Sequence, residues 1–248
     1  MRDYSVTPNP NVPFELRLTD SSFLVVEKPS GVVTQPGKGH EKDSLLNALF
    51  VDYGNLLQNL GEARGWGLLH RLDRETSGLV LVALRNASYE KLLQQFRDRK
   101  VQKIYWAIVA GHPRPAQGVI QKPIAEVVAG RKKAVLSRTG QQAITAYRVL
   151  QESEDVSLIE ARPKTGRLHQ IRIHMADLGC PLLGEDTYAR GVSLPRVPRL
   201  CLHAASLSFL HPETQRRITV HAPWPADLKG MLSKFHLDEP RPEDVGQM

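Results

Sequence analysis

The stretch His70-Arg-Leu-Asp-Arg-Glu-Thr-Ser-Gly78 decides the fold, because it runs at once into the apolar segment Leu79-Val-Leu-Val-Ala-Leu84. A continuous apolar run of this length after a polar turn predicts a buried strand. In the turn, the carboxylate of Asp73 stands between Arg71 and Arg74. Surface loops normally need no such order. The arrangement therefore indicates one charged group that is held rigidly at the mouth of a cleft.

The rest of the chain predicts an α+β fold with a mixed, mostly antiparallel sheet. Strands are expected within 14–28, 79–84, 103–110, 144–150, 156–162, 200–210 and 217–221, and helices at 43–52, 86–99, 168–178 (introduced by 164–167) and 225–235. These elements show no regular β-α-β alternation, which argues against a Rossmann fold. We expect a flexible N-terminal arm at residues 1–13, one folded body at 14–236 and a flexible C-terminal tail at 237–248.

Three local features give sharper expectations. Asp43 is expected to cap the helix that ends near Asp52, and Gly54–Gly67 to form a loop. The stretch Gly130–Gln142 is rich in cations and holds no acidic residue, so it predicts a basic hairpin that turns at Thr139-Gly140. Such a run is usually a solvated face, but on a nucleic-acid-binding protein it would grip phosphates.

Composition narrows the class of protein. The 248 residues include 33 Lys and Arg against 26 Asp and Glu, a net charge of +7. Such an excess favours a polyanionic partner, nucleic acid before an anionic membrane, although it is equally common in basic proteins with no such partner. The two cysteines, Cys180 and Cys201, argue against a disulfide scaffold. Because no signal peptide or membrane-spanning run is present, we expect a soluble, cytoplasmic protein.

Most familiar catalytic motifs are missing. The chain has no Cys-x-x-Cys, and His169 and His174 lie five residues apart, a spacing that does not place both on one helical face. We therefore expect no metal site. Gly37-Lys-Gly39 is too short for a phosphate-binding loop, and there is no Gly-x-Ser-x-Gly. What remains is Asp73 with nearby arginines. A loop aspartate usually only caps its turn, but a nucleophilic carboxylate must stay ionised and aimed, and a guanidinium partner does both.

Five segments, taken together, resemble the RluA family of RNA pseudouridine synthases. His70–Gly78 resembles its catalytic motif, Phe23–Gly31 its opening strand and turn, Lys103–Gly111 its tyrosine motif, Lys164–His174 with Gly184–Tyr188 its arginine motif, and Leu200–Ala204 with His211-Pro212 its closing strands. They follow the family's order and cover about residues 14 to 224. The resemblance implies a pseudouridine synthase fold with a central RNA-binding cleft and makes 14–236 the catalytic domain.

The resemblance also implies residue roles. Asp73 would be the catalytic aspartate, which attacks C1′ of a flipped uridine or assists its deprotonation. Tyr105 would stack on the uracil, and Arg172 would pair with Asp73. Arg71 would fill the gap that the flipped base leaves, since extruding a base costs a few kcal/mol. No cofactor is implied, because the same atoms leave and return.

Further residues are implied as RNA contacts or as supports of the site. They are His70, Arg74, Thr76, Arg167, His169 and Gln170, together with Arg131, Lys132 and Lys133 in the basic hairpin. The implied partner is structured RNA, a stem-loop of tRNA or rRNA, bound by a monomer that needs no protein partner. Many family members carry an N-terminal S4 domain, for which the expected first strand near Phe14 leaves no room.

Two other readings stay open. An RNA-binding protein of this fold that has lost catalysis, such as a chaperone, would not need Asp73, Tyr105 and Arg172 together. A glycoside hydrolase would need a second carboxylate about 5–10 Å from Asp73. Glu75 is the nearest candidate in the sequence.

Overall fold

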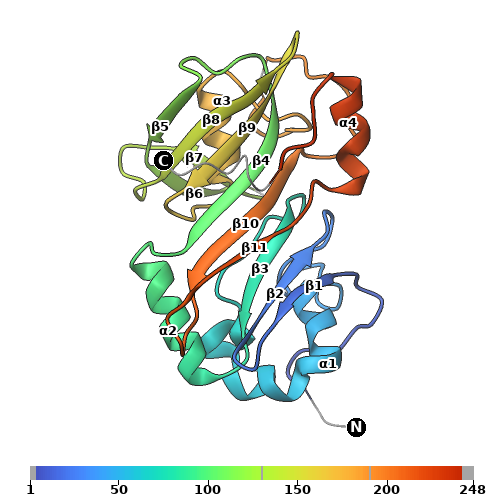
Figure 1. Cartoon of the computed structure of the whole chain (residues 1–248), viewed down its shortest axis with the longest axis vertical. Helices are drawn as coiled ribbons and strands as arrows, with labels where there is room; N and C mark the ends of the chain where they lie inside the picture. The colour runs from blue at the N-terminus through green and yellow to red at the C-terminus, as the bar shows by residue number, and fades with distance from the viewer. Residues whose placement is uncertain (1–3, 130, 190, 242–248) are drawn as a thin grey trace. The chain divides into compact units, whose positions relative to one another are not determined.

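The computed structural model describes residues 4–129, 131–189 and 191–241. The described chain forms two compact units (Figure 1). Unit 1 holds the residues up to Val101 together with Ser206–Ala222, and unit 2 holds Gln102–Ala205 and the residues from Pro223 onward. Helices and mostly antiparallel strands occur in both units, which confirms the predicted α+β class. The sequence instead suggests a single body over 14–236.

Unit 1 is built on an antiparallel sheet. Its strands are β1 (Glu15–Thr19), β2 (Phe23–Lys28) and β3 (Ser77–Ala83), paired in that order, and the C-terminal part of β10 (Leu202–Leu210), which also pairs with β11 (Arg217–His221) (Figure 1). Every residue of β3 is buried. The apolar run after the His70–Gly78 turn is therefore the buried strand that the sequence predicts.

The first helix of unit 1 is longer than predicted. Helix α1 (Leu45–Leu60) starts after Ser44, whose side chain accepts a hydrogen bond from the Asn47 amide while the Asn47 side chain bonds back to the Ser44 amide. This reciprocal capping makes Ser44, not Asp43, the N-cap. The helix continues through Gly54, where a loop was predicted, and the 3₁₀ helix η1 (Glu62–Gly67) follows. Helix α2 (Asn86–Arg97) lies close to its predicted range.

The described part of the predicted N-terminal arm packs on α1. The Tyr4 hydroxyl donates to Asn55 Oδ1 at 2.9 Å, and its ring meets the Phe50 ring edge-on at 5.6 Å. Val6 is buried, and the Asn9 amide donates to the Asn47 carbonyl. Residues 4–12 thus carry contacts that a loose arm would lack. In the predicted tail, the Asp238 amide bonds to Gln151 Oε1, and residues 242–248 lie outside the described residues.

Unit 2 contains further strands of the nine-stranded sheet and a separate hairpin. The sheet order is β4 (Gln102–Ala110), β9 (Val156–Pro163), β8 (Ile144–Glu152) and β5 (Gln117–Gln121). The separate hairpin joins β6 (Ile124–Ala129) to β7 (Arg131–Leu136), with Ala129 opposite Arg131. The basic residues therefore form one strand of this hairpin. The chain does turn at Thr139-Gly140, where the Gly140 amide bonds the Ser137 carbonyl, but this turn follows β7 and does not close the hairpin. The partner of β7 is β6, a strand that the sequence pattern does not predict.

Helices complete unit 2. Helix α3 (Gln170–Asp177) contacts β7, β8 and β9. It starts later than predicted, because His169 has a left-handed backbone (φ 51°) that ends the preceding loop. The 3₁₀ helix η2 (Ala226–Leu228) and α4 (Lys229–Lys234) fall in the predicted last helix. They cover a core that includes Trp106, Ile108, Leu158, Trp224 and Leu228.

Among the described residues, no helix is long and apolar enough to cross a membrane. No group of three or more His, Cys, Asp or Glu side chains in this part of the chain is arranged to hold a metal ion.

Candidate active site

The Asp73 turn in unit 1 is fixed from both sides by hydrogen bonds to its backbone. Before Asp73, the Thr34 hydroxyl donates to the Leu72 carbonyl at 2.8 Å and accepts from the Leu72 amide at 3.1 Å. After it, the Gly31 amide donates to the Arg74 carbonyl at 2.7 Å. The turn itself closes through the Thr76 amide, which donates to the Asp73 carbonyl at 3.1 Å. Asp73, which is half-buried, thus stands on a backbone with little freedom to move.

A buried lysine supports the same turn. Lys28, at the end of β2, has no exposed surface, and its ammonium donates to the carbonyls of Pro29 (2.9 Å), Val32 (2.7 Å) and Arg74 (3.3 Å). A buried charge needs such partners to offset its lost hydration. The sequence motif Phe23–Gly31 includes Lys28 but predicts no role for it. The one signal of its burial is its position at the end of an apolar strand.

The other predicted residues of unit 1 divide by exposure. Arg71 and Arg74 are exposed, and Arg74 Nε lies 3.3 Å from Glu75 Oε1. His70 Nε2 accepts a 3.0 Å bond from the Leu81 amide of β3, and Thr76 is buried. The two arginines therefore face solvent, where a polyanion can reach them, whereas His70 bonds the turn to the strand and Thr76 closes the turn through its amide.

Tyr105 lies in unit 2 on the central strand β4, opposite Ala161 of β9, and is almost completely buried. Lys103 precedes it by two residues, so both side chains project from one face of the strand. Lys103 Nζ donates to the Thr165 carbonyl at 3.4 Å, and burial lowers the pKa of Lys103 to about 8. The sequence motif that contains Tyr105 does not predict that Lys103 is buried beside it.

Arg172 of α3 is held by a carboxylate in its own unit. Its Nε and Nη2 donate to the two oxygens of Glu185 at 2.7 and 2.9 Å, and neither side chain is appreciably exposed. A bidentate guanidinium–carboxylate pair fixes both distance and plane. The same Glu185 accepts the amides of Thr187 (2.8 Å) and Tyr188 (3.2 Å). The Arg172 guanidinium also lies 5.6 Å from the centre of the Tyr188 ring.

The loop before α3 holds three further predicted residues. Gln170 is buried, and its side-chain amide is fully engaged: Oε1 accepts from the Thr165 hydroxyl and the Arg167 amide, and Nε2 donates to Ile144 O and Thr145 Oγ1. Gln170 therefore shapes the loop from inside rather than facing RNA. Arg167 is partly exposed and bonds the Gln142 carbonyl. His169 Nδ1 lies 2.7 Å from the Tyr188 hydroxyl.

The basic hairpin is anchored at its base and exposed toward its turn. Ala134 and Ile124 are buried in a cluster with Ile173 of α3. Lys132 is exposed and lies 3.8 Å from Glu126, and Lys133 is half-buried. The side chain of Arg131 lies outside the described residues.

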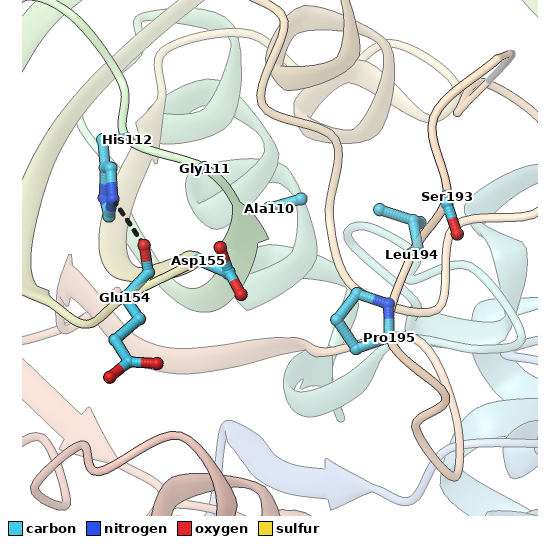
Figure 2. A pocket seen from close by; sticks show the side chains of 8 residues that line it. All are labelled: Ala110, Gly111, His112, Glu154, Asp155, Ser193, Leu194 and Pro195. Atoms are coloured by element: carbon cyan, nitrogen blue, oxygen red, sulfur yellow. Dashed lines mark hydrogen bonds between the residues drawn. The ribbon is translucent and has the colours of Figure 1, made fainter.

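Unit 2 also contains an open pocket of about 610 Å³ (Figure 2). Its lining residues are Ala110, Gly111, His112, Glu154, Asp155, Ser193, Leu194 and Pro195. His112 Nε2 lies 3.1 Å from the Glu154 carbonyl (Figure 2). None of the predicted site residues lines this pocket, and its two carboxylates suit a polyanion poorly.

Comparison with known proteins identifies the family of the chain. The family model described as RNA pseudouridylate synthase matches residues 22–177. Ribosomal large subunit pseudouridine synthase D of Zymomonas mobilis is 36% identical over 228 residues, which cover 88% of this chain and 72% of the relative. The relative of the same name from Xanthomonas campestris is 33% identical over 250 residues, covering 96% and 74%. The solved structure of Human RNA Pseudouridylate Synthase Domain Containing 4 superposes with a TM-score of 0.72 at 26% identity, covering 92% of this chain and 95% of that one. The chain therefore belongs to the RNA pseudouridylate synthase family, of the RluA type that its motifs predict, and is an isomerase that acts on RNA.

Proposed function

We propose that the chain converts a specific uridine in a stem-loop of rRNA or tRNA to pseudouridine, with Asp73 as the catalytic aspartate. The observation that carries this proposal is the clamped turn. Thr34, Gly31 and Lys28 fix the carbonyls on both sides of Asp73. A nucleophile that is held in place before its substrate arrives avoids the cost of ordering it during the reaction.

The chemistry needs the target base outside the helical stack. The uridine flips out of the RNA. Asp73 then either attacks C1′ or assists deprotonation of the uridine. The glycosidic bond then breaks, uracil turns over, and its C5 bonds to C1′, which releases Asp73 if it had attacked there. C5 loses its proton to solvent and N1 takes one up, so the atoms balance. Arg71 occupies the gap in the RNA and offsets part of the few kcal/mol that extrusion costs. Its exposure supports this role.

Tyr105 and Arg172 are proposed to act on the same uridine, on the strength of the motifs to which they belong. Tyr105 stacks on uracil, for which an aromatic ring fixed in a strand is suited. Arg172 keeps Asp73 ionised and oriented. The bidentate bond to Glu185 supports this role, because it sets the plane of the guanidinium in advance.

The RNA backbone is proposed to contact Arg and Lys side chains of both units. These are Arg71, Arg74, Arg167 and the hairpin residues Arg131, Lys132 and Lys133. The two relatives named ribosomal large subunit pseudouridine synthase D favour rRNA over tRNA as the substrate. Binding should weaken steeply as salt rises, because each neutralised phosphate releases counterions.

We place the enzyme in a reducing, cytoplasmic compartment, where it acts as a monomer without cofactor. Burial raises the pKa of the Cys201 thiol to about 12 and also raises that of Cys180. Both thiols therefore stay protonated and poorly reactive. Light scattering of the purified protein, alone and with RNA, tests the monomer.

The decisive experiment compares Asp73→Asn with Glu75→Gln. Tritium release from RNA labelled at uridine C5 measures turnover, and filter binding measures affinity. Asp73→Asn should abolish turnover and keep RNA affinity within a few-fold, because the amide keeps the size of the carboxylate but not its charge. Glu75→Gln should retain turnover. Turnover by the Asn variant would remove Asp73 from the mechanism, and a loss in the Gln variant alone would point to Glu75.

A further inference from the structure

Tyr188 touches three parts of unit 2 at once. Its hydroxyl accepts a 3.0 Å hydrogen bond from the backbone amide of Ala134 in β7 and lies 2.7 Å from His169 Nδ1. Its ring packs edge-on to the His169 imidazole and under the guanidinium of Arg172, 5.6 Å from centre to Cζ. One side chain thus links the basic hairpin, the loop before α3 and the arginine.

The position of Tyr188 is itself fixed. Its amide donates to Glu185 Oε1, the carboxylate that grips Arg172. The turn also depends on Gly184, which has φ 80° and lies so close to Arg199 that a Cβ would come within 2.4 Å of its carbonyl oxygen. Tyr188 and Arg172 are therefore held by the same acid. A shift of the Tyr188 ring would change its packing against the guanidinium.

The other end of the link is the strand that carries the hairpin cations. Ala134 follows Lys133 directly and is two residues from Lys132. Its side chain is buried against α3, while its amide points to the Tyr188 hydroxyl. A phosphate that attracts Lys132 or Lys133 would displace β7. The Ala134 amide would carry this displacement to the Tyr188 hydroxyl, which accepts its hydrogen bond.

We propose that Tyr188 is a positioning residue that couples RNA contact at the basic hairpin to the orientation of Arg172. The inference rests on the proposed function of the hairpin and of Arg172 and adds a connection between them. With RNA on the hairpin, the Ala134 bond holds the Tyr188 ring in place, and the ring completes the cradle of the guanidinium. RNA that misses the hairpin leaves Arg172 less well aimed, so the link favours turnover of correctly docked RNA.

Two variants separate the hydroxyl from the ring. Tyr188→Phe removes the bonds to Ala134 and His169 but keeps the ring under Arg172. We expect it to lower kcat by about tenfold, the size of effect that a lost hydrogen bond allows, while KM stays within about twofold. Tyr188→Leu also removes the ring and should lower kcat further. Equal kcat values for the two variants would mean that the ring has no role.

A double-mutant cycle tests the coupling itself. The hairpin variant Lys132→Gln/Lys133→Gln should lower kcat/KM by about tenfold, and so should Tyr188→Phe. If Tyr188 transmits the hairpin contact, the combined variant should lose far less than the product, about hundredfold. Arg71→Ala serves as the control, because it lies on the other unit and has no bond to Tyr188. Its effect should multiply with that of Tyr188→Phe.

A spectroscopic signal gives an independent readout. In an Asp73→Asn background, which should stop turnover, RNA should shift the NMR signal of the Arg172 Nε–H, and Tyr188→Phe should abolish this shift. Multiplicative losses in the hairpin cycle, or an RNA-induced shift that survives in Tyr188→Phe, would overturn the coupling. Hairpin variants that bind RNA like the wild type would overturn the coupling together with the proposed hairpin role, whereas activity that survives Asp73→Asn would refute only the proposed catalytic aspartate.

Discussion

The ammonium of Lys28 lies 3.3 Å from the carbonyl oxygen of Arg74, the residue that follows Asp73. A fully buried lysine is costly unless its charge is well solvated by the protein. Here the three backbone carbonyls that it bonds belong to the segment after β2 (Pro29 and Val32) and to the Asp73 turn (Arg74). The lysine therefore joins a core strand to the loop that carries the candidate nucleophile.

Lys28→Met should weaken both the fold and the turn. The methionine fills most of the space but leaves the carbonyls without their donor, which should lower the free energy of unfolding by about 1–3 kcal/mol. Urea denaturation measures this change. Turnover, assayed well below the unfolding midpoint, should also fall, because the Arg74 carbonyl beside Asp73 would keep only the Gly31 amide as its donor. The exposed Lys38 provides the control, and Lys38→Met should change neither quantity. Full activity in a destabilised Lys28→Met would show that the lysine serves the fold alone.

Glu185→Gln should destabilise unit 2 strongly. The change replaces one acceptor oxygen by an NH₂ group, which faces the N–H groups of Arg172, and it removes the buried carboxylate charge that is bound to the guanidinium in two places. Breaking a buried pair in this way costs about 3–5 kcal/mol. Thermal and urea unfolding measure the loss. Asp186 supplies a matched control, since its carboxylate is 3.7 Å from Arg172 but 85% exposed. Asp186→Asn should stay within about 0.5 kcal/mol of the wild type. Equal losses in the two variants would contradict the assignment of Glu185 as the main partner.

The sequence predicts those parts of the fold that local pattern determines. Strand β3 follows from a continuous apolar run, and α2 from an apolar stripe at helical spacing. The end of α1 is not predictable in this way, because Gly54 normally favours a loop. In the structure a Cβ at Gly54 would lie 2.9 Å from the Tyr4 ring. The glycine therefore makes room for a residue fifty positions earlier, and this contact overrides its low helix propensity.

The candidate site shows the same division. Asp73, Tyr105 and Arg172 can be singled out because they lie in recognisable motifs, and their roles stay predictions. Their supports cannot be singled out in this way, since each acts across the chain: Lys28 bonds a carbonyl 46 residues away, and Tyr188 bonds an amide 54 residues away. For Gln170 the structure differs from the expectation. Its motif suggests an RNA contact, whereas Thr165 of the same motif and Ile144, which is 26 residues away in the sequence, occupy its amide.

Lys103 should make RNA binding depend on pH near 8. Burial lowers its pKa to about 8, so the ammonium is charged below that pH and neutral above it. If this charge on the Tyr105 face contacts RNA, affinity should fall as pH rises through the pKa, and bound phosphate should move the step upward by stabilising the ammonium. The affinity of Asp73→Asn for RNA that still holds its uridine, measured from pH 6.5 to 9.5, checks this.

Two substitutions make the assignment of that step specific. Lys103→Arg stays charged throughout the range, so its affinity should not fall at this step. The exposed Lys164 provides the control, and Lys164→Met should retain the step. A wild-type affinity that does not change across pH 8 would remove Lys103 from the RNA contact.

His174 should make the protein less stable in mild acid. It is fully buried; the Thr145 hydroxyl lies 2.9 Å from Nδ1, and the Lys122 carbonyl lies 3.0 Å from Nε2. Burial lowers the pKa of His174 below its usual value of 6.5. The unfolded chain therefore takes up a proton near pH 6.5 that the folded chain refuses, and the free energy of unfolding falls as pH drops below that value.

The measurement is urea denaturation at pH 7.5, 6.5 and 5.5. His221, whose pKa burial also lowers, acts in the same direction, so the wild type should lose stability at each step down. His174→Gln keeps a neutral hydrogen-bonding side chain and should lose less stability between pH 7.5 and 5.5 than the wild type, although it starts from a lower value. The exposed His236→Gln should follow the wild-type slope. If His174→Gln falls as steeply as the wild type, the buried imidazole is not the group that titrates.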